Sequence, residues 1–134
     1  MAELFINVLY HYREQRKYLL HEFVVMPNHF HLLLTPGETL ERAMQLIKGA
    51  FSFRAKKELR VGSDIWQTSF YDRRVRDMRE YEKMRLYIHH NPVGTGLIEG
   101  ADEYPYSSRN PKFELDDVTQ RLKPAGSSAA NWQA

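Results

Sequence analysis

The chain contains no cysteine, and this absence excludes disulfide bonds, zinc sites built on thiolates and thiol nucleophiles. It also lacks long apolar runs. The apolar runs over residues 23–26 and 32–34 are far shorter than a membrane-spanning segment, which needs about 20 residues. No basic flank precedes an apolar stretch at the N-terminus, so we expect no secretory signal. Histidine, carboxylate and amide groups remain as metal ligands, and we expect a cytoplasmic protein without membrane contact.

A large excess of charge of one sign is missing as well. The sequence has 19 Lys and Arg residues against 17 Asp and Glu residues, a net charge of +2. Any binding of nucleic acid must then be argued from where the positive charge lies. With 134 residues, 43% of them hydrophobic, the chain is long enough for one domain with one core. We expect that domain over residues 1–111 and a partly disordered C-terminal extension over residues 112–134, whose small residues have little to bury.

The spacing of apolar residues predicts an α+β fold, in which helices cover an antiparallel β-sheet. Pro27 marks a tight turn between two strands, because proline cannot donate to a central ladder. Thr39 and Asp77 are typical N-cap residues, and Pro92 should end the last helix, since the residue before proline avoids the α region. The predicted elements are strands over 19–26, 29–35 and 69–76 and helices over 2–17, 40–58 and 78–90.

His29, Phe30 and His31 open the second predicted strand. Because a strand alternates its side chains, both histidines should leave the sheet on one face, while Phe30 and Leu32 enter the opposite, apolar face. Two imidazoles on one face could hold a divalent cation. Histidines with this spacing are also common as surface or hydrogen-bonded residues, so the pair alone leaves both interpretations open.

Tyr87 and Asn91 lie one turn apart on the same side of the last predicted helix. A phenol and an amide oxygen could therefore approach one centre. Together with metal-binding histidines, they suit attack of a phenolate on a phosphodiester, because a cation would neutralise the phosphate oxygens. The ordinary alternative is a packed tyrosine with its hydroxyl at the surface. Among the neighbouring histidines, His90 is preferred over His89 as a residue supporting the metal ligands.

Two basic clusters could bind nucleic acid, although a solvated charged face is the ordinary interpretation of each. In a nucleic-acid site, arginines would hold phosphates and aromatic rings would stack on unpaired bases. Trp66 is assigned to the core instead. The candidate DNA-binding residues are Lys48, Arg54, Lys56 and Lys57 on a helix face and Arg73, Arg74 and Arg76 on the strand that follows.

Three blocks of the sequence together resemble the signature blocks of the IS200-like transposase superfamily, and in particular its REP-associated tyrosine transposase branch. They are residues 26–36 (MPNHFHLLLTP), 66–77 (WQTSFYDRRVRD) and 87–97 (YIHHNPVGTGL). The resemblance spans roughly residues 19–109, and three ordered blocks are much more specific than one His-x-His pair.

The resemblance implies a single-tyrosine HUH endonuclease of single-stranded or hairpin DNA with a ferredoxin-like (RRM-like) fold, associated with the nucleoid. It makes His29 and His31 the metal ligands for Mg²⁺ or Mn²⁺, Asn91 the third ligand and Tyr87 the nucleophile. The products would be a 5′-phosphotyrosine and a 3′-hydroxyl. Because the covalent link retains the energy of the phosphodiester, a 3′-hydroxyl could rejoin the strands without ATP.

One departure from the family pattern concerns the start of the sheet. Similar members begin with an additional strand before the first helix, whereas this chain begins almost at that helix. Either the start is truncated or the sheet is completed differently, for example by a partner chain at an exposed edge in a homodimer.

Two other functions compete with the transposase. The first is a domesticated or truncated copy that binds structured single-stranded DNA without cutting it. The second is a His-x-His metal hydrolase of a small phosphoester, which would remain active without Tyr87.

Overall fold

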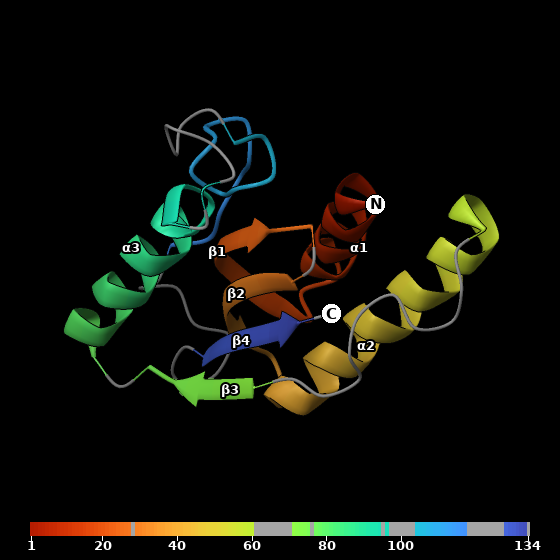
Figure 1. Cartoon of the computed structure of the whole chain (residues 1–134). Helices are drawn as coiled ribbons and strands as arrows, with labels where there is room; N and C mark the ends of the chain where they lie inside the picture. The colour runs from red at the N-terminus through yellow and green to blue at the C-terminus, as the bar shows by residue number, and fades with distance from the viewer. Residues whose placement is uncertain are drawn as a thin grey trace.

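Figure 1 shows helices on both faces of one antiparallel sheet in the computed structural model: α1 and α2 cover one face, and α3 covers the other. The structure describes residues 1–27, 29–60, 71–75, 77–94, 96, 104–117 and 128–133. The predicted α+β class is confirmed. Among the described residues, no helix has both the length and the apolar character needed to cross a membrane. The elements are α1 (Ala2–Glu14), β1 (Tyr18–Val25), β2 (His29–Pro36), α2 (Leu40–Arg54), a π-helical turn (Ala55–Leu59), β3 (Tyr71–Arg74), α3 (Met78–Gly94) and β4 (Ser128–Gln133).

Strands β1 and β2 form the tight hairpin that the sequence predicts. Val25 pairs with Phe30, and the Met26 N–H donates to the His29 carbonyl at 2.7 Å. Pro27 lies in the turn, where its missing N–H costs no ladder bond. This turn places His29 at the start of β2.

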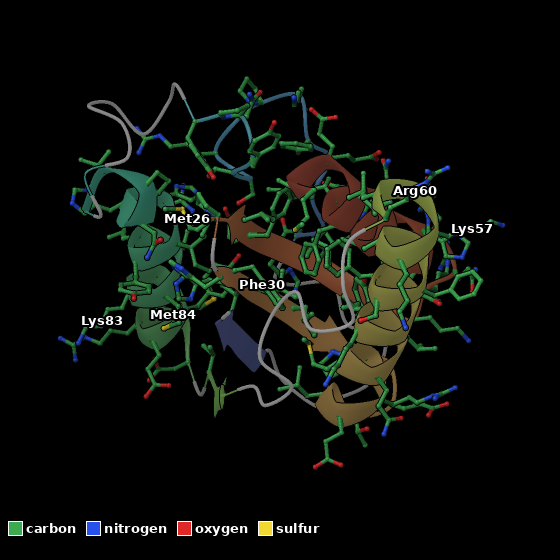
Figure 2. All side chains as sticks on the ribbon, turned by 45° about the vertical axis from the view of Figure 1, so that its right-hand side comes forward. Met26, Phe30, Lys57, Arg60, Lys83 and Met84 are labelled. Atoms are coloured by element: carbon green, nitrogen blue, oxygen red, sulfur yellow. The ribbon has the colours of Figure 1, made fainter. Side chains whose placement is uncertain are left out.

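The two faces of β2 are buried in different cores. Phe30, Leu32 and Leu34 pack into the larger core with α1 and α2, and the ring centroids of Phe5 and Phe30 are 4.4 Å apart. Figure 2 labels Phe30 inside the molecule, between the sheet and α2. Leu33 belongs to the second core, under α3. The alternation predicted from the sequence is confirmed, and it turns the histidine face of β2 towards α3.

Strand β4 lies between β2 and β3 and is antiparallel to both, so the sheet order is β1-β2-β4-β3. Residues 128–133, which the sequence placed in a partly disordered extension, form this strand of the sheet. A strand paired on both sides is held by its backbone N–H and C=O groups and does not need large apolar side chains. In the part of the chain that the structure describes, the position beside β2 is thus filled by the chain's own strand β4.

The outer edge of β1 is covered by residues 104–117. The Val25 N–H donates to Tyr106 O at 2.9 Å, the Ser108 N–H to Phe23 O at 2.9 Å, and the Asp116 N–H to Leu20 O at 2.8 Å. Residues 112–117, predicted as the start of the extension, therefore belong to a packed segment. The predicted homodimer contact through a sheet edge stays a prediction, and the described residues 104–117 already occupy the β1 edge.

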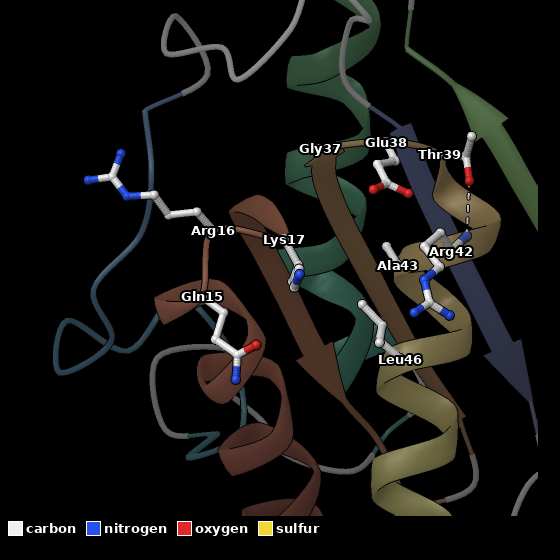
Figure 3. A pocket seen from close by; sticks show the side chains of 9 residues that line it. All are labelled: Gln15, Arg16, Lys17, Gly37, Glu38, Thr39, Arg42, Ala43 and Leu46. Atoms are coloured by element: carbon white, nitrogen blue, oxygen red, sulfur yellow. Dashed lines mark hydrogen bonds between the residues drawn. The ribbon is translucent and has the colours of Figure 1, made fainter.

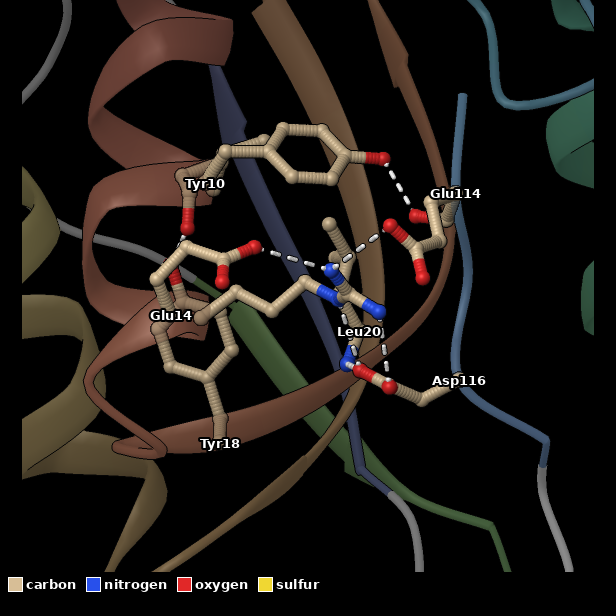
Figure 4. A network of polar contacts seen from close by, with 8 residues as sticks. Tyr10, Glu14, Tyr18, Leu20, Glu114 and Asp116 are labelled. Atoms are coloured by element: carbon tan, nitrogen blue, oxygen red, sulfur yellow. Dashed lines mark hydrogen bonds and ion pairs between the residues drawn. The ribbon is translucent and has the colours of Figure 1, made fainter. Parts of the chain in front are cut away.

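A partly buried ion pair ties this segment to α1, in the network that Figure 4 shows. Arg13 donates from Nε and Nη2 to the two carboxylate oxygens of Asp116, both at 2.9 Å, and the Leu20 N–H donates to Asp116 Oδ2 at 2.9 Å. Tyr10 donates its hydroxyl to Glu114 O at 2.7 Å. The segment is anchored by side chains as well as by the edge of β1.

Both predicted N-caps are confirmed. The Arg42 N–H donates to Thr39 Oγ1 at 3.1 Å, and the Glu80 N–H donates to Asp77 Oδ1 at 2.9 Å. The predicted end of the last helix is wrong, because α3 continues through Pro92 to Gly94. A proline in the last turn removes only one helical hydrogen bond, and the burial of Asn91 and Pro92 against the sheet outweighs the local preference of the residue before proline.

Candidate functional site

His29 and His31 leave β2 on the face that α3 covers. His31 is only 5% exposed, whereas His29, next to the turn, is half-buried. The two ring centroids lie 5.0 Å apart, and the rings are nearly perpendicular. The backbone of β2, paired on both sides, holds the two rings in this arrangement.

Helix α3 brings two further polar side chains to the histidines. Asn91 is buried, with Oδ1 at 3.3 Å from His29 Nε2 and Nδ2 at 3.3 Å from His31 Nε2. Tyr87, one turn earlier, has its ring centroid 5.2 Å from that of His31. The structure therefore brings together the four residues that the sequence grouped.

Tyr87 differs from the other tyrosines near α3 in its exposure. Its side chain is 53% exposed, whereas Tyr81 and Tyr104 are buried, and burial raises the pKa of each of these two phenols to about 12. A buried phenol of high pKa is a poor source of phenolate, and an extended substrate could not reach it. Of these three tyrosines, only Tyr87 is placed to act on a macromolecule.

The donor atoms fit a divalent cation. Both Nε2 atoms face one amide group at 3.3 Å, which is near the spacing of about 3 Å between neighbouring ligands when each metal bond is about 2.1 Å. Within the described residues, no third histidine or carboxylate joins the pair to form a metal-binding group. The set of two imidazoles and one amide is neutral, so a bound cation would keep its full charge for a phosphate.

The two histidines that follow Tyr87 in the chain differ in burial: His89 is buried and His90 is exposed. His90 is exposed, and its ring lies beside Gly94, where a β-carbon would be 3.5 Å from Cδ2. His89 is buried, and its Nε2–H donates to Glu22 Oε1, because a carboxylate only accepts. The sequence reasoning missed Glu22. Its signal was a carboxylate inside the apolar run of the first strand, since a buried charge requires a partner.

The basic residues of α2 are not brought to Tyr87. Helix α2 packs on the Phe30 face of the sheet, opposite the histidine face. Lys56 and Lys57 are exposed at the end of this helix, where Figure 2 labels Lys57. Arg54 is paired with Glu58 at 2.7 Å, and this guanidinium lowers the pKa of the Glu58 carboxyl.

The remaining candidates are placed only in part. Lys48 is half-buried on α2. Arg73 and Arg74 lie in β3, which pairs with β4. Arg76 and Trp66 lie outside the described residues.

A separate pocket of about 360 Å³ lies between the end of α1 and the start of α2. Figure 3 shows the side chains of Lys17, Glu38 and Arg42 at this pocket, whereas the side chain of Arg16 extends away from them. At the start of α2, the Arg42 N–H already donates to Thr39 Oγ1, so this backbone donor is engaged within the helix cap. This pocket is formed by different elements from those that carry Tyr87.

Comparison with known proteins assigns the chain to a class. Residues 1–91 match the family model described as transposase IS200 like. The chain therefore belongs to the IS200-like transposase family.

Two individual relatives are both REP-associated tyrosine transposases by name. The chain is 30% identical over 105 residues to a protein of Haemophilus influenzae assigned as a REP-associated tyrosine transposase, covering 68% of this chain and 60% of that protein. It is 25% identical over 99 residues to the REP-associated tyrosine transposase of Escherichia coli, covering 72% of this chain and 57% of that protein. The chain thus spans somewhat more than half the length of these relatives.

A solved structure has the same fold. It is the structure of a REP-associated tyrosine transposase bound to a REP hairpin, with a TM-score of 0.67 and 22% sequence identity. The similarity covers 92% of this chain and 77% of that one. At this identity the likeness defines the fold, and the chemistry must be argued from the residues.

Proposed function

We propose that this protein cuts and rejoins single-stranded DNA at hairpin-forming repeats, with Tyr87 as the nucleophile. One observation carries the proposal: Tyr87, exposed on α3, lies beside the cluster of His29, His31 and Asn91. The REP-associated relatives and the hairpin-bound structural neighbour support the choice of substrate.

The reaction is a transesterification at phosphorus. The Tyr87 hydroxyl loses its proton, and its oxygen forms a bond to the scissile phosphorus while the bond to the 3′ oxygen breaks. The leaving oxygen takes up a proton and becomes a 3′-hydroxyl, and the 5′ side stays on the enzyme as a phosphotyrosine. The reverse attack by a 3′-hydroxyl restores a phosphodiester, so strands are rejoined without an external energy source.

His29, His31 and Asn91 would hold a divalent cation, Mg²⁺ or Mn²⁺. Bound there, the cation would supply charge neutralisation for the phosphate oxygens and lower the barrier for a phenol whose ordinary pKa is about 10. The protein's own part is to orient the two imidazoles through β2 and the amide through α3. The exposure of Tyr87 leaves room for a DNA strand over this face.

A covalent adduct tests the nucleophile. We expect purified protein with Mn²⁺ and a labelled hairpin oligonucleotide to form a protein–DNA adduct that resists denaturation. Tyr87→Phe should abolish the adduct, and Tyr12→Phe, on a different helix, should not. Hairpin binding without any adduct in the unaltered protein would favour a non-catalytic binder of structured DNA. Undiminished adduct in Tyr87→Phe would remove Tyr87 from this role.

The metal ligands are tested separately. His31→Ala removes one imidazole of the cluster, so we expect metal-dependent cleavage to be lost and calorimetric Mn²⁺ binding to weaken by at least about 10-fold. Hairpin binding in EDTA should be nearly unchanged, because without a bound cation we expect this histidine to contribute little to phosphate binding. Cleavage that persists in His31→Ala would exclude the histidine pair as the metal site.

A further inference from the structure

Three buried polar groups from three separate segments meet beneath α3. Glu22 of β1, His89 of α3 and Ser108 of the edge segment are each less than 9% exposed. Ser108 Oγ donates to Glu22 Oε1 at 2.8 Å and accepts the Phe23 N–H at 2.9 Å, while the His89 Nε2–H donates to the same carboxylate oxygen. The Glu22 carboxylate thus joins the sheet, α3 and the edge segment.

We propose that Glu22 is a positioning residue: through His89 it sets the rotation of α3 that presents Tyr87 and Asn91 to the histidine pair. This inference rests on the proposed function for its consequence in catalysis. Its structural content, that the contact fixes the helix, does not depend on that function.

The contacts of α3 lie on two flanks of the helix. Residues 89 and 91 are about 200° apart around the axis at about 100° per residue. His89 contacts Glu22 on β1, whereas Asn91 contacts the histidines on β2. Ile88, fully buried, faces the sheet between these flanks. A rotation that releases the first contact therefore moves the second.

Apolar packing alone would not set this rotation. The core under α3 contains Ile88, Val24 and Leu33, and hydrophobic contact is non-directional. Hydrogen bonds weaken steeply when their angle changes. Arg85, one turn before His89, adds a second contact from the same flank, with Nε at 4.0 Å from Glu22 Oε2. Two side chains of α3 therefore converge on one carboxylate.

The test separates positioning from stability. Replacing both partners by apolar groups of similar size, in Glu22→Met/His89→Leu, leaves no unpaired buried charge and should keep the fold. We expect kcat for hairpin nicking to fall by about 10-fold to 100-fold, as a small misplacement of reacting groups does, with KM changed less than about 3-fold. Glu22→Gln, which keeps an acceptor oxygen for His89, should retain most of the activity.

Asp116→Ala is the matched control. In the unaltered protein, the ion pair between Asp116 and Arg13 is another partly buried carboxylate contact, and it anchors the same edge segment to α1. The substitution breaks this ion pair. We expect it to lower Tm and to leave kcat within about 2-fold. An equal loss of kcat in Asp116→Ala and in the double variant would overturn the positioning role, because general destabilisation would then explain both.

A distance measurement is independent of nicking. Because the chain has no cysteine, spin labels can be placed on Leu86→Cys in α3 and Gln45→Cys in α2, both exposed and on opposite faces of the sheet. We expect Glu22→Met/His89→Leu to shift or broaden the distance distribution and Asp116→Ala to leave it unchanged. An unchanged distribution in the double variant overturns the inference. A changed distribution in a protein that never nicks DNA supports the positioning role and refutes the proposed function alone.

Discussion

At the scale of single residues, His21 shows how a buried histidine is kept neutral. Its Nδ1–H donates to Asp116 O at 2.8 Å, and Nε2 lies 2.8 Å from Thr35 Oγ1, which donates to it. Burial lowers the pKa of this imidazole below its ordinary value, because the charged form is poorly solvated inside the protein.

The lowered pKa of His21 predicts a loss of stability in mild acid. Above about pH 6.5, His21 is neutral in both the folded and the unfolded state; below it, the unfolded state takes up the proton first, so the free energy of unfolding falls. His21 alone can change the free energy of unfolding by at most about 1.4 kcal/mol per pH unit. Urea unfolding between pH 5 and 8 should show a flatter pH dependence in His21→Gln than in His11→Gln, an exposed control. Parallel curves would contradict this assignment.

The neutral donor set predicts the effect of a charge at Asn91. In Asn91→Asp, a carboxylate replaces the amide 3.3 Å from both imidazoles, so we expect tighter Mn²⁺ binding, by about 10-fold, from added Coulomb attraction. The same negative charge should lower kcat for nicking, because less positive charge then acts on the phosphate. Calorimetry and single-turnover kinetics measure the two effects. Weaker Mn²⁺ binding in this variant would argue against Asn91 as a ligand.

At the scale of elements, α2 carries a surface that its packing does not explain. Phe53 is 67% exposed, and Lys56 and Lys57 follow it by one turn. An exposed aromatic ring beside cations suits the stacking and phosphate contacts of unpaired nucleic acid. Since α2 lies on the face opposite Tyr87, DNA bound at both places would have to pass around the sheet.

The surface on α2 predicts a salt-dependent loss of affinity. Lys56→Ala/Lys57→Ala should weaken hairpin binding and lower the slope of log K against log salt by about 1.5, if both lysines contact phosphates. Nicking at saturating DNA should keep its rate. Lys112→Ala, an exposed lysine of the edge segment, is the control. An unchanged salt slope in the double variant would exclude this face as a DNA contact.

The elements also show what a sequence can predict. Caps and alternation are local, so the starts of α2 and α3 and the faces of β2 follow from Thr39, Asp77 and the His29–His31 spacing. Local rules also place residues 87 and 91 on one helix side, but it was the resemblance to the transposase family that assigned them to one site with the histidine pair. The end of α3 does not follow from local rules, since burial of Pro92 is a tertiary effect. Glu22 stands out locally as a carboxylate in an apolar run, but its partner His89 is distant in sequence, so no local pattern could pair the two.

At the scale of the whole molecule, β4 is the element that completes the sheet. Ala130 pairs with Leu32 on one side and with Asp72 on the other. Ala130 therefore lies in a central strand, with backbone pairing to a neighbouring strand on each side. No rule based on composition could identify a short segment of mostly small and polar residues as a central strand.

The central position of Ala130 predicts a strong response to proline. Ala130→Pro removes a ladder hydrogen bond and imposes the ring on a central strand, so we expect the free energy of unfolding to fall by about 3 kcal/mol or more. Ala130→Ser should change it by less than about 1 kcal/mol. Denaturant unfolding measures both, and adduct formation should fall in the proline variant alone. Equal stability of the two variants would show that β4 does not occupy this position in solution.

The late place of β4 in the chain has a consequence for biosynthesis. Strand β2 and α3 leave the ribosome well before residues 128–133, so Phe30, already paired with Val25, gains its second strand partner, Trp132, only when β4 has been made. Bringing β4 to β2 closes the long loop of chain between them, which is entropically costly and slow. Until β4 has paired, β2 presents an unpaired edge to other chains. Interrupted translation products would thus contain His29, His31 and Tyr87 without a finished sheet beneath them. The order of synthesis itself would delay any chemistry on DNA until this strand has been made.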